Sequence, residues 1–181
     1  MITLEKPKNF KQWLVLYRLY LQAFPASERK PWGMIRKMYR LGRSDVWCAM
    51  EAGRFKGLAI TINSPDVILL DYLAVDKRHR DQGVGSAILT QMQKRYPGKG
   101  LFLEIENPYA DTPDQALRQR RKAFYLRCGM VPMEVMVYLF GVEMELLGMG
   151  CCLNFEQYQA FYRDHYNAWA ADHIAPSTYP Q

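Results

Sequence analysis

The stretch Leu69–Tyr96 constrains the fold of this chain more than any other, because in it a strand passes through a polar turn into a helix. The residues Val67–Val75 are apolar and β-forming over a length that suits a buried strand. The turn at 76–81 is charged and polar, and apolar residues then recur at the spacing of an amphipathic helix. These helical positions are Val84, Ala87, Ile88 and Met92. The sequence therefore predicts a strand–turn–helix unit around which the other elements are arranged.

Two glycines one residue apart, Gly83 and Gly85, stand between the predicted strand and the predicted helix. They allow backbone amides to turn toward one point, and the start of a helix adds unpaired N–H groups and the positive end of its dipole. Such a turn is a receptor for an anion, most naturally a phosphate or pyrophosphate. The nucleoside-triphosphate motif G-x-x-x-x-G-K-S/T does not occur, and Ile88 stands where a dinucleotide fingerprint needs Gly or Ala. The residues therefore exclude both of these common phosphate-binding motifs.

Length and composition predict one globular domain. The 181 residues are enough to bury a core, and the charged fraction of 23% is ordinary. A net charge of +6 and a pI near 9.1 suit polyanionic partners, either a cofactor that carries phosphates or a nucleic acid. No apolar run is long enough to span a bilayer, and the N-terminal residues lack the apolar core of a signal peptide.

The cysteines predict a reducing compartment, which we interpret as the cytoplasm, and no metal site. They show neither CxxC spacing nor neighbouring histidines, so buried free thiols are the simplest interpretation. The four positions are Cys48, Cys128, Cys151 and Cys152.

Other strands and helices follow from periodicity, caps and turn residues. Before the central unit we expect a strand at Met1–Glu5, a helix from Phe10 that ends before Pro25, a second helix to about Arg40, and a hairpin of Val46–Glu51 with Phe55–Ile62. After it we expect a strand at Leu101–Glu106, a helix capped by Thr112 that runs to about Cys128, strands at Met133–Phe140 and Gly150–Leu153, a helix capped by Asn154, and a loose tail from Ile174.

The turn motif is similar to that of a known family. Arg80-x-x-Gly83-x-Gly85, after a strand that ends in Leu-Ala-Val, resembles the acetyl-CoA-binding motif of the GCN5-related N-acetyltransferase (GNAT) family, whose pattern is Arg/Gln-x-x-Gly-x-Gly/Ala. The family also commonly carries a Tyr four residues before a Gly and a large apolar residue, as at Tyr125 and Gly129. The two motifs stand in the family's order, and the resemblance covers Val46–Leu153.

The resemblance implies an α/β (α+β) fold with a mixed, mostly antiparallel central sheet of about seven strands, flanked by helices, and a C-terminal helix. The strands Val67–Val75 and Leu101–Glu106 are expected to be parallel, because a helix crosses over between them. In the family these two strands splay apart. We expect a single domain over residues 1–173, in which 155–173 form the C-terminal helix, and a tail at 174–181.

The resemblance also implies acetyl-CoA as the cofactor. Its pantetheine arm would fill the gap between the splayed strands through main-chain hydrogen bonds, and its pyrophosphate would sit on the amides of the glycine turn. The residues assigned to the cofactor are Leu73, Ala74, Val75, Arg80, Gln82, Gly83, Val84, Gly85, Ser86, Phe124, Tyr125 and Arg127.

Three further roles concern catalysis. The resemblance makes the Leu73 N–H the donor that polarises the thioester carbonyl, and makes Tyr125 the acid that protonates the departing thiolate. The base is open, since several family members carry a Glu where this chain has Leu69. Glu104, which with Glu106 lies on one face of its strand, is the preferred base, and Asp71 is the alternative.

A second departure from the family concerns Arg118, which stands where many members have an Asn that touches the cofactor. We interpret the basic run 118–122 as a solvated helix face. Family members contact the acceptor through two segments, which correspond here to Phe24–Trp32 and Gly141–Met149.

The leading hypothesis is an acetyl-CoA-dependent N-acetyltransferase that acetylates a primary amine of a small molecule or peptide by direct attack in a ternary complex. A non-catalytic CoA-binding or CoA-sensing protein of the same fold is the alternative, and Leu69 is its main support. A nucleic-acid-binding domain is a third hypothesis, but the aromatic residues lie in apolar stripes rather than among Lys and Arg. Dimers are common in the family, so a homodimer is compatible with the resemblance.

Overall fold

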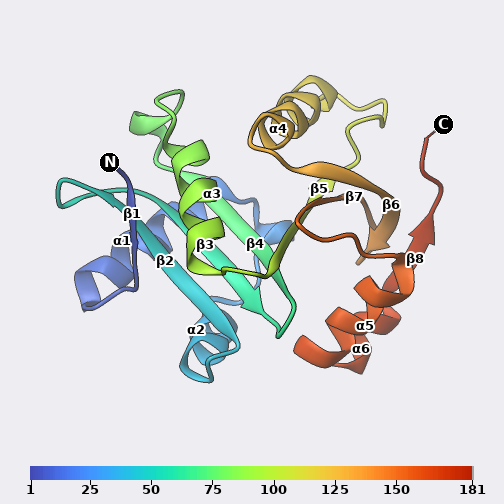
Figure 1. Cartoon of the computed structure of the whole chain (residues 1–181), viewed down its shortest axis with the longest axis horizontal. Coiled ribbons are helices and arrows are strands. Elements are labelled where there is room, and N and C mark those ends of the chain that lie inside the picture. The colour runs from blue at the N-terminus through green and yellow to red at the C-terminus, as the bar shows by residue number, and fades with distance from the viewer. Residues whose placement is uncertain (181) are drawn as a thin grey trace. The chain divides into compact units, whose positions relative to one another are not determined.

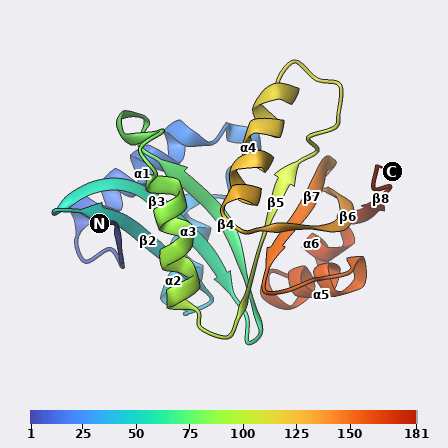
Figure 2. The same cartoon turned by 45° about the horizontal axis from the view of Figure 1, so that its top comes forward.

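The computed structural model describes residues 1–180 and divides into two compact units (Figures 1 and 2). The first unit holds Met1–Ser64 and Ile68–Gly98, and the second holds Pro65–Val67 and Lys99–Gln181. We describe each unit by itself.

The first unit is a sheet with helices on both faces. Its elements are β1 (Thr3–Glu5), α1 (Phe10–Ala23), η1 (Ala26–Glu28), α2 (Trp32–Arg40), β2 (Ser44–Glu51), β3 (Arg54–Asn63), β4 (Val67–Val75), η2 (Lys77–His79) and α3 (Val84–Arg95). The strands follow the order β1-β2-β3-β4, and each pair is antiparallel. The predicted hairpin is therefore present as β2 and β3, and β4 is the strand that leads into the glycine turn.

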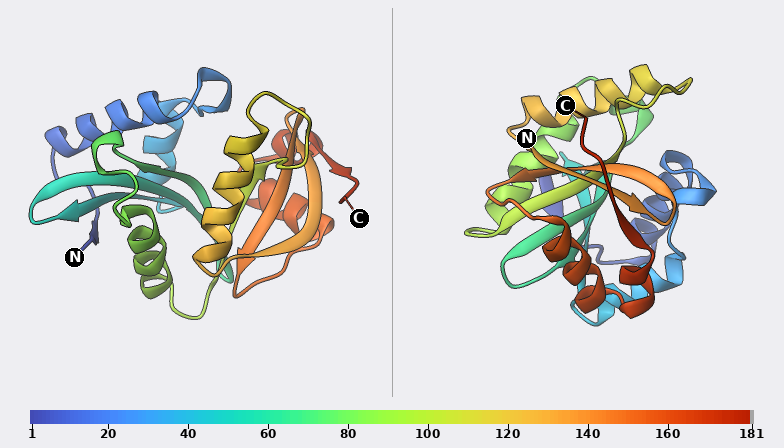
Figure 3. Two further views of the ribbon diagram at one scale, coloured as in Figure 1. Left: turned by 90° about the horizontal axis from the view of Figure 1, so that it is seen from above. Right: turned by 90° about the vertical axis from the view of Figure 1, so that its right-hand side faces the viewer.

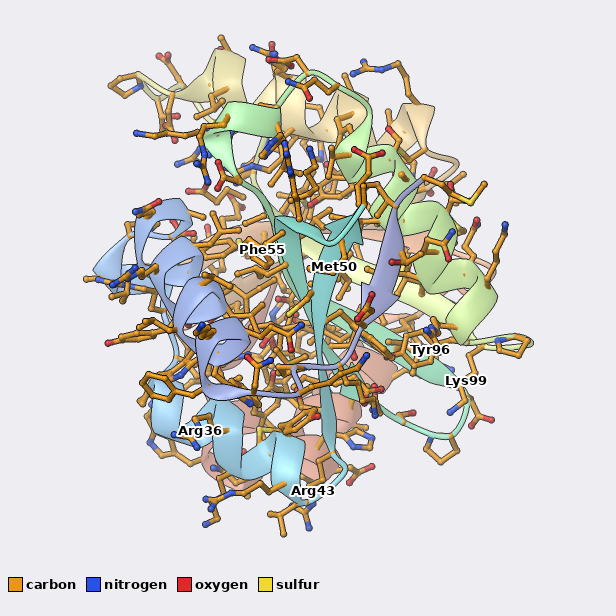
Figure 4. The ribbon with its side chains drawn as sticks, turned by 90° about the vertical axis from the view of Figure 1, so that its left-hand side faces the viewer. Arg36, Arg43, Met50, Phe55, Tyr96 and Lys99 are labelled. Atoms are coloured by element: carbon orange, nitrogen blue, oxygen red, sulfur yellow. The ribbon has the colours of Figure 1, made fainter. Side chains whose placement is uncertain are left out.

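Alternation along β3 decides which helix covers which face of this sheet. Leu58 and Ile60 point into a core built with α1 and α2, whereas Gly57 lies under Ile88 of α3. That core comprises Leu16, Leu19, Tyr20, Ile35, Val46, Cys48, Leu58, Ile60, Tyr72 and Ala74. Figure 4 shows the sheet of the first unit along its edge, between α1 and α3, with Met50 and Phe55 as cross-strand partners near the tip of the β2–β3 hairpin.

A close approach at Gly57 fixes the end of β4, and it gives a stability prediction. A Cβ on Gly57 would lie 2.6 Å from the Ala74 carbonyl oxygen and 3.3 Å from Cδ1 of Ile88. The first contact is to backbone, so the strand itself must shift. We expect Gly57→Ala to lower the free energy of unfolding by about 1–3 kcal/mol, as measured by urea denaturation. A loss below about 0.5 kcal/mol would contradict this packing. Gly33→Ala, whose site is open and whose φ lies outside the left-handed region, is the control and should not destabilise the protein.

The second unit also combines a sheet with helices (Figure 3). Its elements are β5 (Gly100–Glu106), α4 (Gln115–Arg127), β6 (Val131–Leu139), β7 (Val142–Met149), α5 (Phe155–His165), α6 (Ala168–Asp172) and β8 (Ile174–Ser177). The strands follow the order β5-β7-β6-β8, again with antiparallel pairs. The predicted fold class is confirmed: the chain is a mixed α/β protein with mostly antiparallel strands and flanking helices, and residues 1–180 form eight strands. The splaying of β4 from β5 stays a prediction.

The β6–β7 hairpin corrects two predictions. The segment Gly141–Met149, expected to be a loop, is almost entirely strand β7, and Gly150–Leu153, expected to be a strand, is not one. Phe140 and Gly141 form the turn with φ values of 50° and 84°. Positive φ at both central residues is the geometry of a tight hairpin, but Phe is an unusual residue there, so residue types alone do not predict this turn.

Two other element boundaries differ from the predictions. The helix expected from Thr112 begins at Gln115 with Asp114 as its N-cap. The C-terminal helix starts at Asn154, as predicted, with a capping box to Gln157, but it breaks at Asn167, whose side chain caps α6 by accepting from the Ala170 N–H at 2.8 Å. The tail that was expected to be loose forms β8, which pairs with β6.

Within residues 1–180, no helix combines the length and apolarity that crossing a membrane requires, and no cluster of His, Cys, Asp or Glu is arranged to hold a metal. All four cysteines are free. The expected burial of the thiols is correct for Cys48, whereas Cys128 and Cys151 are half-buried and Cys152 is exposed.

Candidate functional site

The turn after β4 is an ordered structure of its own. The Asp76 N–H donates to the Lys56 carbonyl at 2.8 Å, and the Asp76 carboxylate caps η2 by accepting from the Arg78 N–H at 3.0 Å. The Arg78 guanidinium also donates to both carboxylate oxygens, at 3.1 and 2.8 Å. These hydrogen bonds lower the pKa of Asp76 to about 2, so the cap stays charged at neutral pH. These hydrogen bonds therefore hold in place the residues that precede the glycine turn.

The glycine turn leaves the start of α3 open. Gly83 is the N-cap of α3 with a left-handed φ of 75°, and Asp81 also has a positive φ of 59°. The Ala87 N–H makes the first bond of the helix, to the Gly83 carbonyl at 3.0 Å. The N–H groups of Val84, Gly85 and Ser86 therefore precede the first helical hydrogen bond, as at any helix start. The structure brings the predicted anion-binding residues Gln82 to Ser86 together in one turn at a helix N-terminus.

Arg80 and the end of β4 complete this part of the site. The Arg80 side chain folds back toward the strand, with Nε 3.4 Å from the Val75 carbonyl oxygen. Leu73, Ala74 and Val75 lie opposite Ala59, Leu58 and Gly57 of β3. The residues predicted to contact the cofactor in the first unit thus form one continuous segment of chain.

Asp71, the alternative base, is engaged in an ion pair. It is the extra residue of a bulge in β4, because Tyr72 and Leu70 are opposite consecutive residues of β3. Its carboxylate oxygens lie 2.6 and 2.8 Å from Nζ of Lys30, and its side chain is 6% exposed. Asp71 is therefore one member of an ion pair with Lys30.

The Lys30 segment is anchored to β4 by tyrosines. The Tyr72 hydroxyl donates to the Glu28 carbonyl at 2.9 Å and accepts from the Lys30 N–H at 3.1 Å. The Tyr20 hydroxyl donates to the Lys30 carbonyl at 3.0 Å. The predicted acceptor segment Phe24–Trp32 is therefore held against β4 by hydrogen bonds as well as by the aromatic cluster around Tyr20 and Trp32.

Glu104, the preferred base, is held by two tyrosines of α5. Oε1 of Glu104 accepts from the Tyr158 hydroxyl at 2.7 Å and from the Tyr162 hydroxyl at 2.8 Å. Both tyrosine side chains are fully buried, whereas Glu104 is half-buried. Helical periodicity alone does not connect these tyrosines with Glu104.

Glu106 lies on the same strand but has different partners. Its carboxylate oxygens pair with Arg118 at 3.1 Å and with Arg121 at 3.0 Å, both from α4. This corrects the interpretation of residues 118–122 as a solvated face, since the side chains of Arg118 and Lys122 are only 16% and 13% exposed. Lys122 instead pairs with the fully buried Glu145 of β7 at 2.7 Å, a contact that the sequence analysis missed.

Tyr125 occupies the last turns of α4. It is half-buried, and its ring lies 5.1 Å from that of Phe124 at 59°. Burial raises the pKa of Tyr125 to about 12, against a smaller lowering by the charge of Arg121. The phenol is therefore protonated at neutral pH. Phe124 is half-buried and Arg127 is exposed on the same helix.

The fold and the glycine turn define an acetyltransferase of the GNAT class. The sequence model of the acetyltransferase (GNAT) domain matches residues 42–131, a range that contains both β4 with its glycine turn and Tyr125 of α4. The chain belongs to the GNAT family of acetyltransferases. Among the curated proteins no sequence match is found.

Solved structures of this family share the fold. A protein from Bacteroides thetaiotaomicron described as a GNAT acetyltransferase is 15% identical, with a TM-score of 0.71 over 94% of this chain and 98% of its own. An aminoglycoside 6′-N-acetyltransferase solved with coenzyme A is 13% identical, with a TM-score of 0.68 over 82% and 96%. A GNAT acetyltransferase from Elizabethkingia anophelis solved with acetyl-CoA is 17% identical, with a TM-score of 0.59 over 82% and 96%. At these identities the likeness concerns the fold.

Proposed function

We propose that this protein is an acetyl-CoA-dependent N-acetyltransferase that acetylates a primary amine of a small molecule or peptide by direct attack in a ternary complex. The observation that carries this proposal is the glycine turn at the start of α3, which stands within the matched GNAT domain. The structural neighbours solved with coenzyme A or acetyl-CoA support the choice of cofactor. The four free cysteines are compatible with a cytoplasmic location.

The cofactor fits the groups that the first unit offers. The amides from Gln82 to Ser86 are donors suited to a pyrophosphate, and the positive end of α3 favours its charge. Arg80 opens the same turn and supplies a cation. Main-chain groups of Leu73, Ala74 and Val75 would hold the pantetheine arm, and Phe124, Tyr125 and Arg127 of α4 remain the other proposed contacts.

Three groups of the chain would assist the transfer, for which the cofactor supplies an activated acetyl thioester. The Leu73 N–H would donate to the carbonyl oxygen as it gains charge. Glu104 would take the proton from the amine, because Asp71 is already paired with Lys30. Tyr125 would donate its phenolic hydrogen toward the departing sulfur.

Binding and turnover can be tested separately. Calorimetric titration of coenzyme A into the folded protein should give a saturable signal, and a thiol-release assay with acetyl-CoA should respond to at least one class in a panel of polyamines, amino acids, aminoglycosides and peptides. Binding without turnover across the panel would favour the non-catalytic CoA-binding alternative. That alternative has one observation in its favour: the position of the family's Glu is held by Leu69, which is fully buried. Absence of both signals would reject the proposal.

The pKa of Tyr125 predicts how kcat depends on pH in the alkaline range. Because its pKa is raised from 10.0 to about 12, the phenol stays protonated through pH 10, and loss of its proton should not lower kcat in that range. The rate should therefore stay level from its plateau to about pH 10, as measured by thiol release in buffers of constant ionic strength. A fall in kcat near pH 8 that disappears in Tyr125→Phe would contradict the prediction.

A further inference from the structure

Two buried hydroxyls converge on one carboxylate oxygen in the second unit. Tyr158 and Tyr162 stand one helical turn apart on α5, and both donate to Oε1 of Glu104, at 2.7 and 2.8 Å. Their side chains are among the largest fully buried ones in the protein. Three polar groups from two elements thus meet beside the rings of Phe102 and Phe161.

Packing alone does not require these hydroxyls. The rings are already fixed by other rings: Tyr158 lies 6.4 Å from Phe102 in an edge-to-face arrangement, and Tyr162 stacks on Tyr166 at 4.9 Å. Phenylalanine at either position would keep these contacts. Burial of a hydroxyl is costly unless it is hydrogen-bonded, and here both hydroxyls are bonded to the same atom of Glu104. What the two hydroxyls add beyond ring packing is therefore their hydrogen bonds to the Glu104 carboxylate.

We propose that Tyr158 and Tyr162 are positioning residues that hold Glu104 ionised and oriented to take the proton from the acceptor amine. The inference rests on the proposed function, in which Glu104 is the base. Hydrogen bonds to the charged form of a carboxylate favour that form. A pair of donors on Oε1 also restricts rotation of the carboxylate, so that its other oxygen keeps one direction.

The proton and electron balance of the step is complete without a further reactant. The ammonium of the acceptor gives one proton to Glu104 and becomes a free amine. The nitrogen lone pair forms the C–N bond to the acetyl carbon, the C–S bond breaks, and the thiolate takes the second proton of the amine by way of Tyr125 and solvent. Glu104 then releases its proton to solvent. The net change is an ammonium and an acetyl thioester converted to an amide, a thiol and one proton.

Other charged groups of the second unit do not replace the tyrosines. Glu106 on the same strand is paired with Arg118 and Arg121 of α4. The cross-strand neighbour of Glu104 on β7 is Leu146, which carries no charge, and the adjacent Glu145 is paired with Lys122. His165 of α5 lies against the Phe161 ring, so the test must separate its protonation from that of Glu104.

The test is the pH dependence of kcat/KM in Tyr158→Phe, Tyr162→Phe and the double variant. The midpoint of the fall in kcat/KM at acidic pH (the acidic limb) should rise by about one pH unit for each hydroxyl removed. The reason is that one hydrogen bond to a charged carboxylate stabilises its ionised form by about that amount. Above the limb, kcat/KM should recover to within about tenfold of the wild-type value. Tyr179→Phe is the matched control: it removes a phenol that donates to Glu145 at 2.7 Å, and it should leave the limb in place. His165→Gln should also leave it in place.

Further variants separate failure of this inference from failure of the proposed function. Glu104→Gln should lower kcat/KM at every pH while calorimetry still detects coenzyme A. If it does so and the Tyr158→Phe and Tyr162→Phe limbs coincide with the wild-type limb, the positioning role is wrong. If Glu104→Gln keeps full activity, Glu104 is not the base and both proposals about it fail. Should the double variant not fold, the two single variants decide, since each keeps both rings and one hydroxyl.

Discussion

Tyr125→Phe is expected to lower kcat about 100-fold and to change the affinity for coenzyme A less than about twofold. The substitution removes only the hydroxyl, so the half-buried ring keeps its contact with Phe124. A positioned proton donor contributes typically about 10²–10⁴ in rate, and the lower end suits this residue. The measurement is thiol release under saturating acetyl-CoA, together with calorimetry of coenzyme A.

We expect a rate effect at the lower end of this range because the Tyr125 phenol is a weak acid. Burial raises the pKa of Tyr125 to about 12, whereas a thiol has a pKa near 8.5. Complete transfer from this phenol to a free thiolate is therefore uphill, and the hydroxyl acts mainly by donating a hydrogen bond while charge develops on sulfur. Solvent can supply the proton afterwards, which leaves residual activity in the variant.

Tyr17→Phe provides the control, since this tyrosine is exposed on α1 and lies outside the proposed machinery. Its kcat should equal that of the wild type. If Tyr125→Phe turned over within twofold of the wild type, Tyr125 would have no part in the chemistry, while the proposal for the glycine turn would still stand on its binding data.

The elements that were predicted correctly are those determined by residues close together in the sequence. β4 has the bounds expected from its apolar run, and α3 begins directly after Gly83. The Asn154 cap is likewise present, together with Gln157. Each of these depends on residues within a few positions of one another, so the sequence alone carries the information.

The parts that were missed depend on distant or unusual residues. The pairs of Glu104 with Tyr158 and Tyr162 join residues 54 and 58 positions apart, and the Lys30–Asp71 pair spans 41 positions. No periodicity within one element can reveal which oxygen a distant hydroxyl reaches. β7 was missed because Glu145 looks like a surface residue, although its side chain is fully buried against α4. A polar residue amid the apolar alternation of a strand is ambiguous until its partner is known.

For the candidate site, the sequence could name candidate residues but not the partners that hold them. The strand positions alone made Glu104 the preferred base and left Asp71 as the alternative. The structure separates them, because Asp71 has a cation within 2.6 Å whereas Glu104 has two hydroxyl donors. We therefore prefer Glu104 as the proposed base, because the Asp71 carboxylate is already engaged by Lys30.

Lys122→Met is expected to destabilise the protein by about 3–5 kcal/mol, the usual range when one member of a buried ion pair is removed. Nζ of Lys122 lies 2.7 Å from Oε1 of Glu145, whose side chain is fully buried. The Tyr179 hydroxyl donates to the same oxygen at 2.7 Å, but Oε2 of Glu145 finds no hydrogen-bond partner within residues 1–180. Removal of the ammonium leaves a buried carboxylate with one donor, and urea denaturation measures the loss.

The pH dependence of this pair has a definite sign. Burial alone would lower the pKa of Lys122, but its bonds to Glu145 and Tyr109 outweigh burial and raise the pKa above 10.5. A group whose folded-state pKa is raised contributes its full stability below the unfolded-state value and loses it as the pH climbs through the folded-state value. Wild-type stability should therefore hold to about pH 10 and fall beyond it, and the part of that fall due to Lys122 should be absent in Lys122→Met.

The double variant Lys122→Met with Glu145→Leu distinguishes a buried-charge penalty from lost packing. If the cost of Lys122→Met comes from the unpaired carboxylate, replacing Glu145 as well should recover most of it, because an apolar pair of similar volume is often as stable as a buried ion pair. If the double variant is as unstable as Lys122→Met alone, the lysine stem rather than its charge is what α4 needs for packing. A loss below about 1 kcal/mol in the single variant would show that water reaches Glu145 and that the pair is not buried in solution.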